Sequence, residues 1–325
     1  TFLIEHVREA LNLNEQVILF QNRRGYTPLW MCEICNWTPN CVNCDVSLTY
    51  HKHSNQLKCH YCGFSTNPIG SCAACGSNRL KMLGFGTEKI EDELSVIFPD
   101  KVIKRLDLDT TRSKNAYATI INEFDNKQID VLIGTQMVTK GLDFDNVNLV
   151  GVLDADMLLN RTDFRAFERS FNLITQVAGR SGRREKRGKV IIQTGDPDHW
   201  VIQHIINNDY IGFYKNEIIE RANFFYPPYY KVINITLKHK DENVINQASH
   251  QLAMKLRESF KERVLGPEFP VVKRIYNLYL KQIILKIEKD AGDKKIKERI
   301  SKILEEFYSV PFNKSIRVII DVDPA

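Results

Sequence analysis

Every cysteine of this chain lies between Met31 and Gly76, and the eight cysteines form four pairs with Cys-x-x-Cys spacing. A two-residue spacer lets both sulfurs of a turn face one metal ion, while backbone N–H groups of the turn support the thiolates. Because a structural site takes four thiolates, four pairs in so short a window predict two tetrahedral Zn²⁺ sites. The pairs are Cys32/Cys35, Cys41/Cys44, Cys59/Cys62 and Cys72/Cys75.

The way these pairs combine is not fixed by their number. The two inner pairs are separated by fourteen residues, close to the ribbon pattern in which two knuckles face each other across a hairpin. Residues 47–50 and 56–59 are strand-like runs on either side of a polar turn and would form that hairpin. An interleaved cross-brace is the alternative. The nested arrangement predicts one site from Cys41, Cys44, Cys59 and Cys62, and the other from Cys32, Cys35, Cys72 and Cys75.

Three histidines near the cysteines are further candidate ligands: His51, His53 and His60. Structural zinc sites are four-coordinate and closed, and eight sulfurs already fill two of them. We therefore expect the three imidazoles to face solvent or nucleic acid.

A secreted domain stapled by disulfides is the competing interpretation of the cysteine-rich segment. Against it, no apolar signal segment precedes the cysteines, and a chain of 325 residues can form a core without disulfide bonds. No stretch reaches the roughly 18 uncharged apolar residues that span a bilayer. We expect reduced thiols, no membrane role and a cytoplasmic protein. The net charge of +5, with its basic surplus in residues 224–325, suits a polyanionic partner.

The elements that must position the cysteines and the polar loops alternate between strand and helix along the first part of the chain. This alternation predicts a parallel sheet covered on both faces, with ligand sites in the loops that follow the strands. We expect strands at residues 17–20, 102–106, 130–133, 149–154 and 189–194, and helices at residues 2–11, 87–98, 115–124, 163–177 and 199–222.

A stiff segment, Tyr226-Pro227-Pro228-Tyr229, ends the last of these helices and predicts a domain boundary. Beyond it the order of elements becomes βαββαβ, the split-βαβ or ferredoxin-like plan. We expect strands at residues 232–238, 271–275, 282–287 and 316–321, and helices at residues 244–262 and around 296–307.

Three polar loops carry the residues that suit phosphate chemistry: residues 21–26, 134–144 and 176–184. In the third loop, Arg180 and Arg183 are each preceded by glycine, so no neighbouring side chain blocks a phosphate beside them. Guanidinium groups offer bidentate contacts and a permanent charge, which neutralises charge that develops on a transferring phosphoryl group. Each loop taken alone is also compatible with a solvated polar turn.

The sequences of these loops resemble the motifs of superfamily 2 helicases. QVAGRSGR is similar to motif VI, VLIGTQMVTKGLDF to motif V and FQNRRGY to motif IV. An eight-cysteine insert between FQNRRGY and GFGTEKIEDEL narrows the resemblance to the primosomal protein N-prime (PriA) family. The segments DLDTTRSKNAY, TDFRAFER, FYPPYYKV and DVDP fit that family in order, so the resemblance covers essentially the whole chain.

The resemblance implies an α/β fold class with three parts. Residues 1–29 and 83–223 are expected to form a RecA-like second helicase lobe, a parallel sheet with helices on both faces. Residues 30–82 are expected to form the zinc-binding insert, and residues 224–325 an α+β carboxyl-terminal domain of the ferredoxin-like type.

The resemblance also implies roles for single residues. Arg180 and Arg183 would reach across a cleft to the γ-phosphate of ATP as catalytic residues. The nucleotide site would include Gln176, Asp143 and Gly141. Contacts to the backbone of single-stranded DNA are implied for Arg23, Arg24, Thr135, Gln136 and Lys140. Backbone contacts carry no sequence information, which suits a motor that acts on any fork.

As a function, the resemblance implies an ATP-dependent DNA helicase that moves 3′ to 5′, recognises stalled forks and D-loops, and starts primosome assembly for replication restart. The implied cofactors are two Zn²⁺, ATP and Mg²⁺. The implied partners are forked DNA, D-loops, single-stranded DNA, single-strand-binding protein, primosome proteins and the loader of the replicative helicase. A monomer associated with the bacterial nucleoid is also implied.

One feature of such an ATPase is missing from this sequence. It contains no phosphate loop of the type Gly-x-x-x-x-Gly-Lys-Ser/Thr and no acidic Walker B pair in a DEAH-like setting. The chain therefore resembles the carboxyl-terminal half of the family. Arginines without the lobe that grips the phosphates and Mg²⁺ have nothing to act on, so we expect no ATPase activity from this chain alone. The alternative function is a non-enzymatic, zinc-containing module that docks DNA or primosome proteins.

Overall fold

The computed structural model divides the chain into two compact units. Unit 1 comprises residues 1–28 and 84–217, and unit 2 comprises residues 29–83 and 218–325. The structure describes residues 2–324 except 22–28, 52–53, 84–85, 108–109, 112, 114, 140–143, 145, 162 and 182–187. The insert and the carboxyl-terminal domain, expected as separate domains, thus fall in one unit. Among the described residues, no helix combines the length and the apolar character that crossing a membrane requires.

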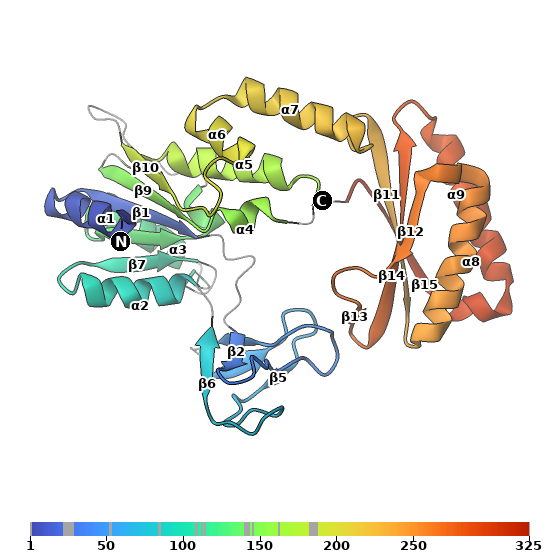
Figure 1. Cartoon of the computed structure of the whole chain (residues 1–325), viewed down its shortest axis with the longest axis horizontal. Coiled ribbons are helices and arrows are strands. Elements are labelled where there is room, and N and C mark those ends of the chain that lie inside the picture. Colours follow the sequence, from blue (N-terminus) through green and yellow to red (C-terminus); the bar gives the residue numbers. More distant parts are fainter. Residues whose placement is uncertain are drawn as a thin grey trace. The chain divides into compact units, whose positions relative to one another are not determined.

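Unit 1 is built on a five-stranded parallel sheet, as the alternating pattern predicted. Its central strand, Gln16–Gln21, is buried along its whole length, as expected for a strand covered on both faces. The strand order is β10-β9-β1-β8-β7 (Figure 1). The strands are β1 Gln16–Gln21, β7 Ile103–Leu106, β8 Val131–Gly134, β9 Val147–Leu153 and β10 Lys189–Ile192.

Helices cover both faces of this sheet, and neighbouring residues of β1 point to opposite faces. Val17 and Leu19 pack in one apolar cluster with helices α1 and α2. Ile18 and Phe20 pack in the other, with α3, α5, α6 and α7. The helices are α1 Phe2–Asn12, α2 Thr87–Ile97, α3 Ala116–Asp125, α4 Asp156–Leu159, α5 Ala166–Ala178, α6 Trp200–Ile206 and α7 Tyr210–Asn223.

The prediction of a single helix at residues 199–222 is wrong in one respect, because the structure has two helices there, α6 and α7. The chain turns between α6 and α7, where Asn208 adopts a positive φ of 51°. Asparagine tolerates this left-handed conformation better than most residues. Asp209 then accepts the N–H of Gly212 at 2.8 Å and so supports the first turn of α7.

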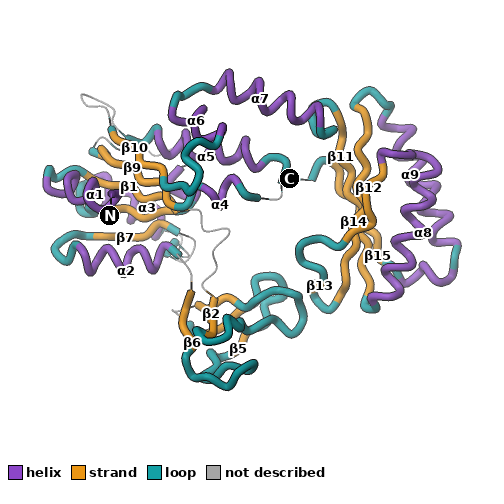
Figure 2. Tube along the Cα trace, in the orientation of Figure 1, coloured by secondary structure: helices purple, strands orange, loops and turns teal. Residues whose placement is uncertain are grey.

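The insert of unit 2 forms a small antiparallel sheet in the order β5-β4-β3-β2-β6. Loops make up most of the insert (Figure 2). Its first and last strands pair with each other, with Cys32 opposite Leu80, so the insert closes where it begins and ends. The predicted hairpin is present as β3 and β4. The strands are β2 Leu29–Cys32, β3 Thr49–His51, β4 Gln56–Lys58, β5 Ser65–Thr66 and β6 Leu80–Leu83.

The rest of unit 2 is an antiparallel sheet with the predicted βαββαβ order and with two helices, α8 and α9, packed on one face (Figure 1). The strand order is β12-β14-β11-β15, and β13 pairs with β14. The elements are β11 Tyr230–His239, α8 Glu242–Phe260, β12 Val264–Glu268, β13 Arg274–Ile275, β14 Leu278–Glu288, α9 Asp293–Ser309 and β15 Arg317–Val322.

The prediction of the second strand of this domain at residues 271–275 is wrong. The second strand of the domain is β12 at Val264–Glu268, and only Arg274 and Ile275 of the expected segment form a strand. β12 contains Gly266 and Pro267, which ordinarily argue against a strand. Here they lie at an irregularity of an edge strand, where proline is tolerated. Gly266 has a φ of 89°, and a Cβ atom there would lie 2.7 Å from the carbonyl oxygen of Gln282.

Candidate metal sites and motif loops

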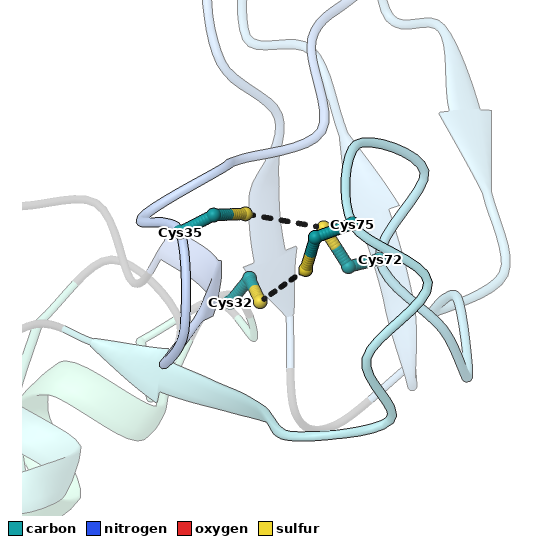
Figure 3. Close-up of side chains that lie close together, drawn as sticks. All are labelled: Cys32, Cys35, Cys72 and Cys75. Atoms are coloured by element: carbon teal, nitrogen blue, oxygen red, sulfur yellow. Dashed lines mark hydrogen bonds between the residues drawn. The ribbon is translucent and has the colours of Figure 1, made fainter.

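The outer cysteine pairs form one cluster of four sulfurs, here called the neck cluster: Cys32, Cys35, Cys72 and Cys75. Their Sγ atoms lie within 4.8 Å of one another and point toward a common centre (Figure 3). The Sγ–Sγ distances are 3.6 Å for Cys32 and Cys75 and 3.5 Å for Cys35 and Cys72. Cys35 and Cys75 are exposed, so this cluster lies at the surface.

The inner pairs form the second cluster, here called the distal cluster: Cys41, Cys44, Cys59 and Cys62. Its Sγ atoms also lie within 4.8 Å of one another, and those of Cys41 and Cys62 are 3.5 Å apart. Three of its four cysteines are buried. They share an apolar cluster with Leu48 and Leu57, against which Phe64 packs. The structure thus gathers the eight sulfurs in the nested arrangement rather than in the cross-brace.

The geometry of both clusters fits zinc. Four sulfurs at about 2.3 Å from one ion lie about 3.8 Å apart in a tetrahedron, close to the observed 3.5–3.6 Å. All eight cysteines are free, and sulfurs that lie 3.5–3.6 Å apart argue against the disulfide interpretation, because a disulfide bond is about 2.05 Å long. Zinc held by four thiolates leaves no position for a substrate or water. The donor sets therefore support two structural zinc sites.

Backbone N–H groups supply the electrostatic support that thiolates need. Asn43 donates its N–H to Cys41 Sγ at 3.4 Å, and Ala74 does the same to Cys72 Sγ at 3.4 Å. The N–H of Phe64 lowers the pKa of the Cys62 thiol to about 7. Burial raises the pKa of the Cys44 thiol to about 12. Binding of a metal ion deprotonates coordinating thiols whatever these values are.

The histidines take no part in the sulfur clusters of the described residues, which contain cysteine alone. The rings of His51 and His60 pack against each other with their centroids 5.1 Å apart. His53 lies outside the described residues.

Two predicted DNA-contacting residues, Thr135 and Gln136, follow β8 directly at the carboxyl end of the sheet. The chain turns there into a short 3-10 helix, Gln136–Thr139, that packs back on the strand end. A Cβ atom on Gly134 would lie 2.1 Å from Val138 Cγ1, so the close turn requires glycine. The Thr135 N–H donates to the carbonyl of Leu106 on β7 at 3.3 Å.

A predicted nucleotide-binding residue, Gln176, and a predicted catalytic residue, Arg180, lie at the end of α5. Gln176 is in its last turn, and Arg180 follows Gly179, which caps the helix. Gln176 and Gln136 line one pocket of about 250 Å³ together with Arg161 and Arg169. The structure therefore brings together residues of the second and third loops. Their roles in binding DNA and nucleotide stay predictions.

The six remaining predicted site residues lie outside the described residues of the chain: Arg23, Arg24, Lys140, Gly141, Asp143 and Arg183.

A buried carboxylate in the segment DLDTTRSKNAY was not predicted as a site residue. Asp107 is fully buried after β7, and it accepts the hydroxyl of Thr87 at 2.6 Å and the N–H of Thr110 at 3.1 Å. Arg105 contacts Asp107 and, at 2.6 Å, Glu91. An aspartate directly after a strand, followed three and four residues later by Thr110 and Thr111, was the signal in the sequence.

Three protein-family models match successive segments of the chain. The model of the PriA DNA helicase Cys-rich region matches residues 41–66, that of the helicase conserved C-terminal domain residues 78–185, and that of the primosomal protein N C-terminal domain residues 222–325.

Curated relatives match along nearly the whole chain. The replication restart protein PriA of Bacillus subtilis is 38% identical over 99% of this chain, and that of a Synechocystis species is 39% identical over 95%. The chain spans only 40% and 37% of the length of these relatives. Among solved structures, the Pyrococcus furiosus Hef helicase domain matches 59% of this chain and 24% of that one, at 18% identity and a TM-score of 0.28.

Proposed function

The chain carries the carboxyl-terminal domains of the PriA family, and on that basis we propose that it is part of an ATP-dependent DNA helicase for replication restart. The whole enzyme would move 3′ to 5′, recognise stalled forks and D-loops, and start primosome assembly in the bacterial cytoplasm. This chain would supply the second helicase lobe, the zinc-binding insert and the carboxyl-terminal domain. ATP and Mg²⁺ would bind between this lobe and an amino-terminal one.

The observation that carries the proposal is the meeting of two motif loops at the carboxyl end of the parallel sheet. Gln136 follows β8, and Gln176 lies in the last turn of α5, four residues before Arg180. Because α5 contacts the 3-10 helix that begins at Gln136, a shift of the nucleotide-facing end of α5 would move the DNA-facing loop. Such a connection is what a motor needs to convert lobe closure into movement along a strand.

In the proposed motor, Arg180 contacts the γ-phosphate, and its substitution tests the role. An arginine finger contributes roughly 10³ to 10⁵ in catalytic rate. In a protein that also has the amino-terminal ATPase lobe, Arg180→Ala should therefore abolish fork-stimulated ATP hydrolysis and leave the affinity for forked DNA nearly unchanged. The matched control is Arg299→Ala, since Arg299 contacts Ser259 in the carboxyl-terminal domain. Normal hydrolysis by Arg180→Ala would refute the assignment.

This chain alone should hydrolyse no ATP, because it has no phosphate loop. DNA-stimulated hydrolysis by the purified 325-residue chain would contradict that expectation. The zinc clusters favour a second candidate function, in which the chain docks forked DNA, single-strand-binding protein or primosome partners without catalysis. Binding of a fluorescent fork by this chain, compared before and after zinc removal, tests this candidate.

A further inference from the structure

The four Cys-x-x-Cys turns share one backbone bond. In each turn, the N–H of the first cysteine donates to the carbonyl of the residue five positions later. The donor and acceptor residues are Cys32 and Trp37, Cys41 and Val46, Cys59 and Phe64, and Cys72 and Ser77, at 2.8–2.9 Å. The four turns therefore share the same backbone bond at their first cysteine, and they can be compared at the positions that follow.

Three of the four turns then close on themselves, and one does not. The residue four positions after the first cysteine adopts a positive φ and donates its N–H back to that cysteine in the turns that contain Asn36, Gly63 and Gly76. The equivalent residue in the Cys41–Cys44 turn is Asp45, which is not among the positive-φ residues. Its N–H donates to the carbonyl of Arg274 at 2.9 Å. This turn is thus completed by the carboxyl-terminal domain.

The segment that meets Asp45 is the tip of the β13–β14 hairpin. Ile275 pairs with Leu278, and the two residues between them, Tyr276 and Asn277, have φ values of 54° and 58°. This is the pattern of a two-residue type I′ turn, whose own N–H groups do not belong to the strand ladder. Tyr276 donates its N–H to Cys44 Sγ at 3.4 Å, and Asn277 donates its N–H to the carbonyl of Asn43 at 2.8 Å.

Side chains reinforce the contact on both sides of the turn. Arg274 Nε donates to Asp45 Oδ1 at 3.0 Å, and Asn277 Nδ2 donates to Asn43 Oδ1 at 3.1 Å. Ile275 packs against the apolar cluster that contains the distal cysteines. The contact therefore combines backbone pairing, an ion pair and apolar burial, and it includes a hydrogen bond to a ligand sulfur.

We propose that the β13–β14 hairpin tip is part of the outer coordination sphere of the distal metal site, so that zinc binding and attachment of the carboxyl-terminal domain to the insert are one coupled equilibrium. Zinc fixes Cys44 and the turn on which the hairpin rests. The hairpin in turn supplies an N–H to the Cys44 thiolate and covers the apolar side of the site. Because coupling of this kind is reciprocal, removal of either partner weakens the other. The neck cluster has no such partner among the described residues.

The first test measures zinc release from the 325-residue chain to a chromogenic chelator. Ile275→Asp places a carboxylate against the apolar cluster, and we expect one of the two zinc equivalents to leave at least tenfold faster, while the other keeps its rate. The control, Val271→Asp, adds the same charge nearby at a side chain that is 87% exposed, and should release zinc like the wild type. Equal release from the two variants would overturn the proposal.

The second test runs in the opposite direction and does not require the hairpin variant to fold. Cys59→Ser removes a distal ligand, and Cys35→Ser removes a neck ligand. Hydrogen exchange at the amides of Tyr276 and Asn277 should accelerate at least tenfold in Cys59→Ser and stay unchanged in Cys35→Ser. Unchanged exchange in Cys59→Ser, or equal acceleration in both variants, would overturn the proposal. Neither experiment uses ATP or DNA, so the outcome is independent of the helicase assignment.

Discussion

The neck and distal clusters have the same four ligands and the same spacing within each pair, but the protein supports them differently. The neck cluster lies beside the paired strands β2 and β6, and two of its cysteines are exposed. The distal cluster lies in an apolar cluster, and a segment more than 200 residues further along the chain donates to one of its sulfurs. The ligands alone therefore do not determine how a zinc site is stabilised.

The two clusters lie beside different parts of unit 2, so their zinc ions would connect different segments of the chain. At the neck, zinc would hold the two ends of the insert together. Glu33 there donates its N–H to the carbonyl of Arg79 at 2.9 Å. At the distal site, zinc would hold a surface on which another part of unit 2 rests. A small domain gains much of its folding free energy from metal binding. On this proposal, zinc at the neck cluster would close the insert, and zinc at the distal cluster would also fix the β13–β14 hairpin.

The largest expected effect comes from removing a ligand sulfur. A structural zinc ion contributes roughly 10–16 kcal/mol of apparent binding free energy, so Cys44→Ser and Cys35→Ser should each bind one zinc ion instead of two. Only Cys44→Ser should also abolish the protection of residues 46–58 from hydrogen exchange, because Leu48 and Leu57 pack on the distal cysteines. Metal analysis and exchange mass spectrometry measure the two effects. Equal loss of protection in both variants would show that the clusters form one cooperative unit.

The zinc ligands and the main sheets were predictable because their signals are local and depend on residue type. Cysteine spacing favoured the nested arrangement and left the cross-brace open, and the apolar run around Ile18 and Leu19 indicated a buried strand, which is the central strand of unit 1. The strand β12 was missed because Gly266 and Pro267 disfavour strands except at an edge, and edge position is a property of the assembled sheet.

The hairpin contact could not have been predicted in that way. Tyr276 contacts Cys44 through its backbone N–H, a group that every residue except proline possesses. No residue type carries the signal, and the partners are 232 positions apart. The sequence feature that relates to this contact is Asp45, because the other three turns have asparagine or glycine at the equivalent position.

An intermediate effect is expected from the apolar packing around the distal cluster. Leu57 is fully buried, and truncation of a buried leucine to alanine typically costs about 2–5 kcal/mol. Leu57→Ala should therefore destabilise the insert by that amount in urea unfolding and speed zinc release from the distal site alone. Val42→Ala is the control, because Val42 lies between two distal ligands, Cys41 and Cys44, but is 59% exposed. If both substitutions have the same effect, apolar burial does not distinguish the two clusters.

The smallest expected effect tests whether the open turn is what attaches the hairpin. Asp45→Gly gives this turn the residue found in two of the self-closing turns and removes the ion pair with Arg274. Zinc content should stay at two ions per chain, because no ligand changes, while exchange at the Tyr276 amide should accelerate several-fold. Lys81→Ala is the control, since it removes a surface ion pair at the neck, the one between Lys81 and Glu33. Exposed ion pairs contribute little by themselves, so exchange at Tyr276 should not respond to Lys81→Ala. Acceleration by both substitutions would assign the effect to surface charge rather than to closure of the turn.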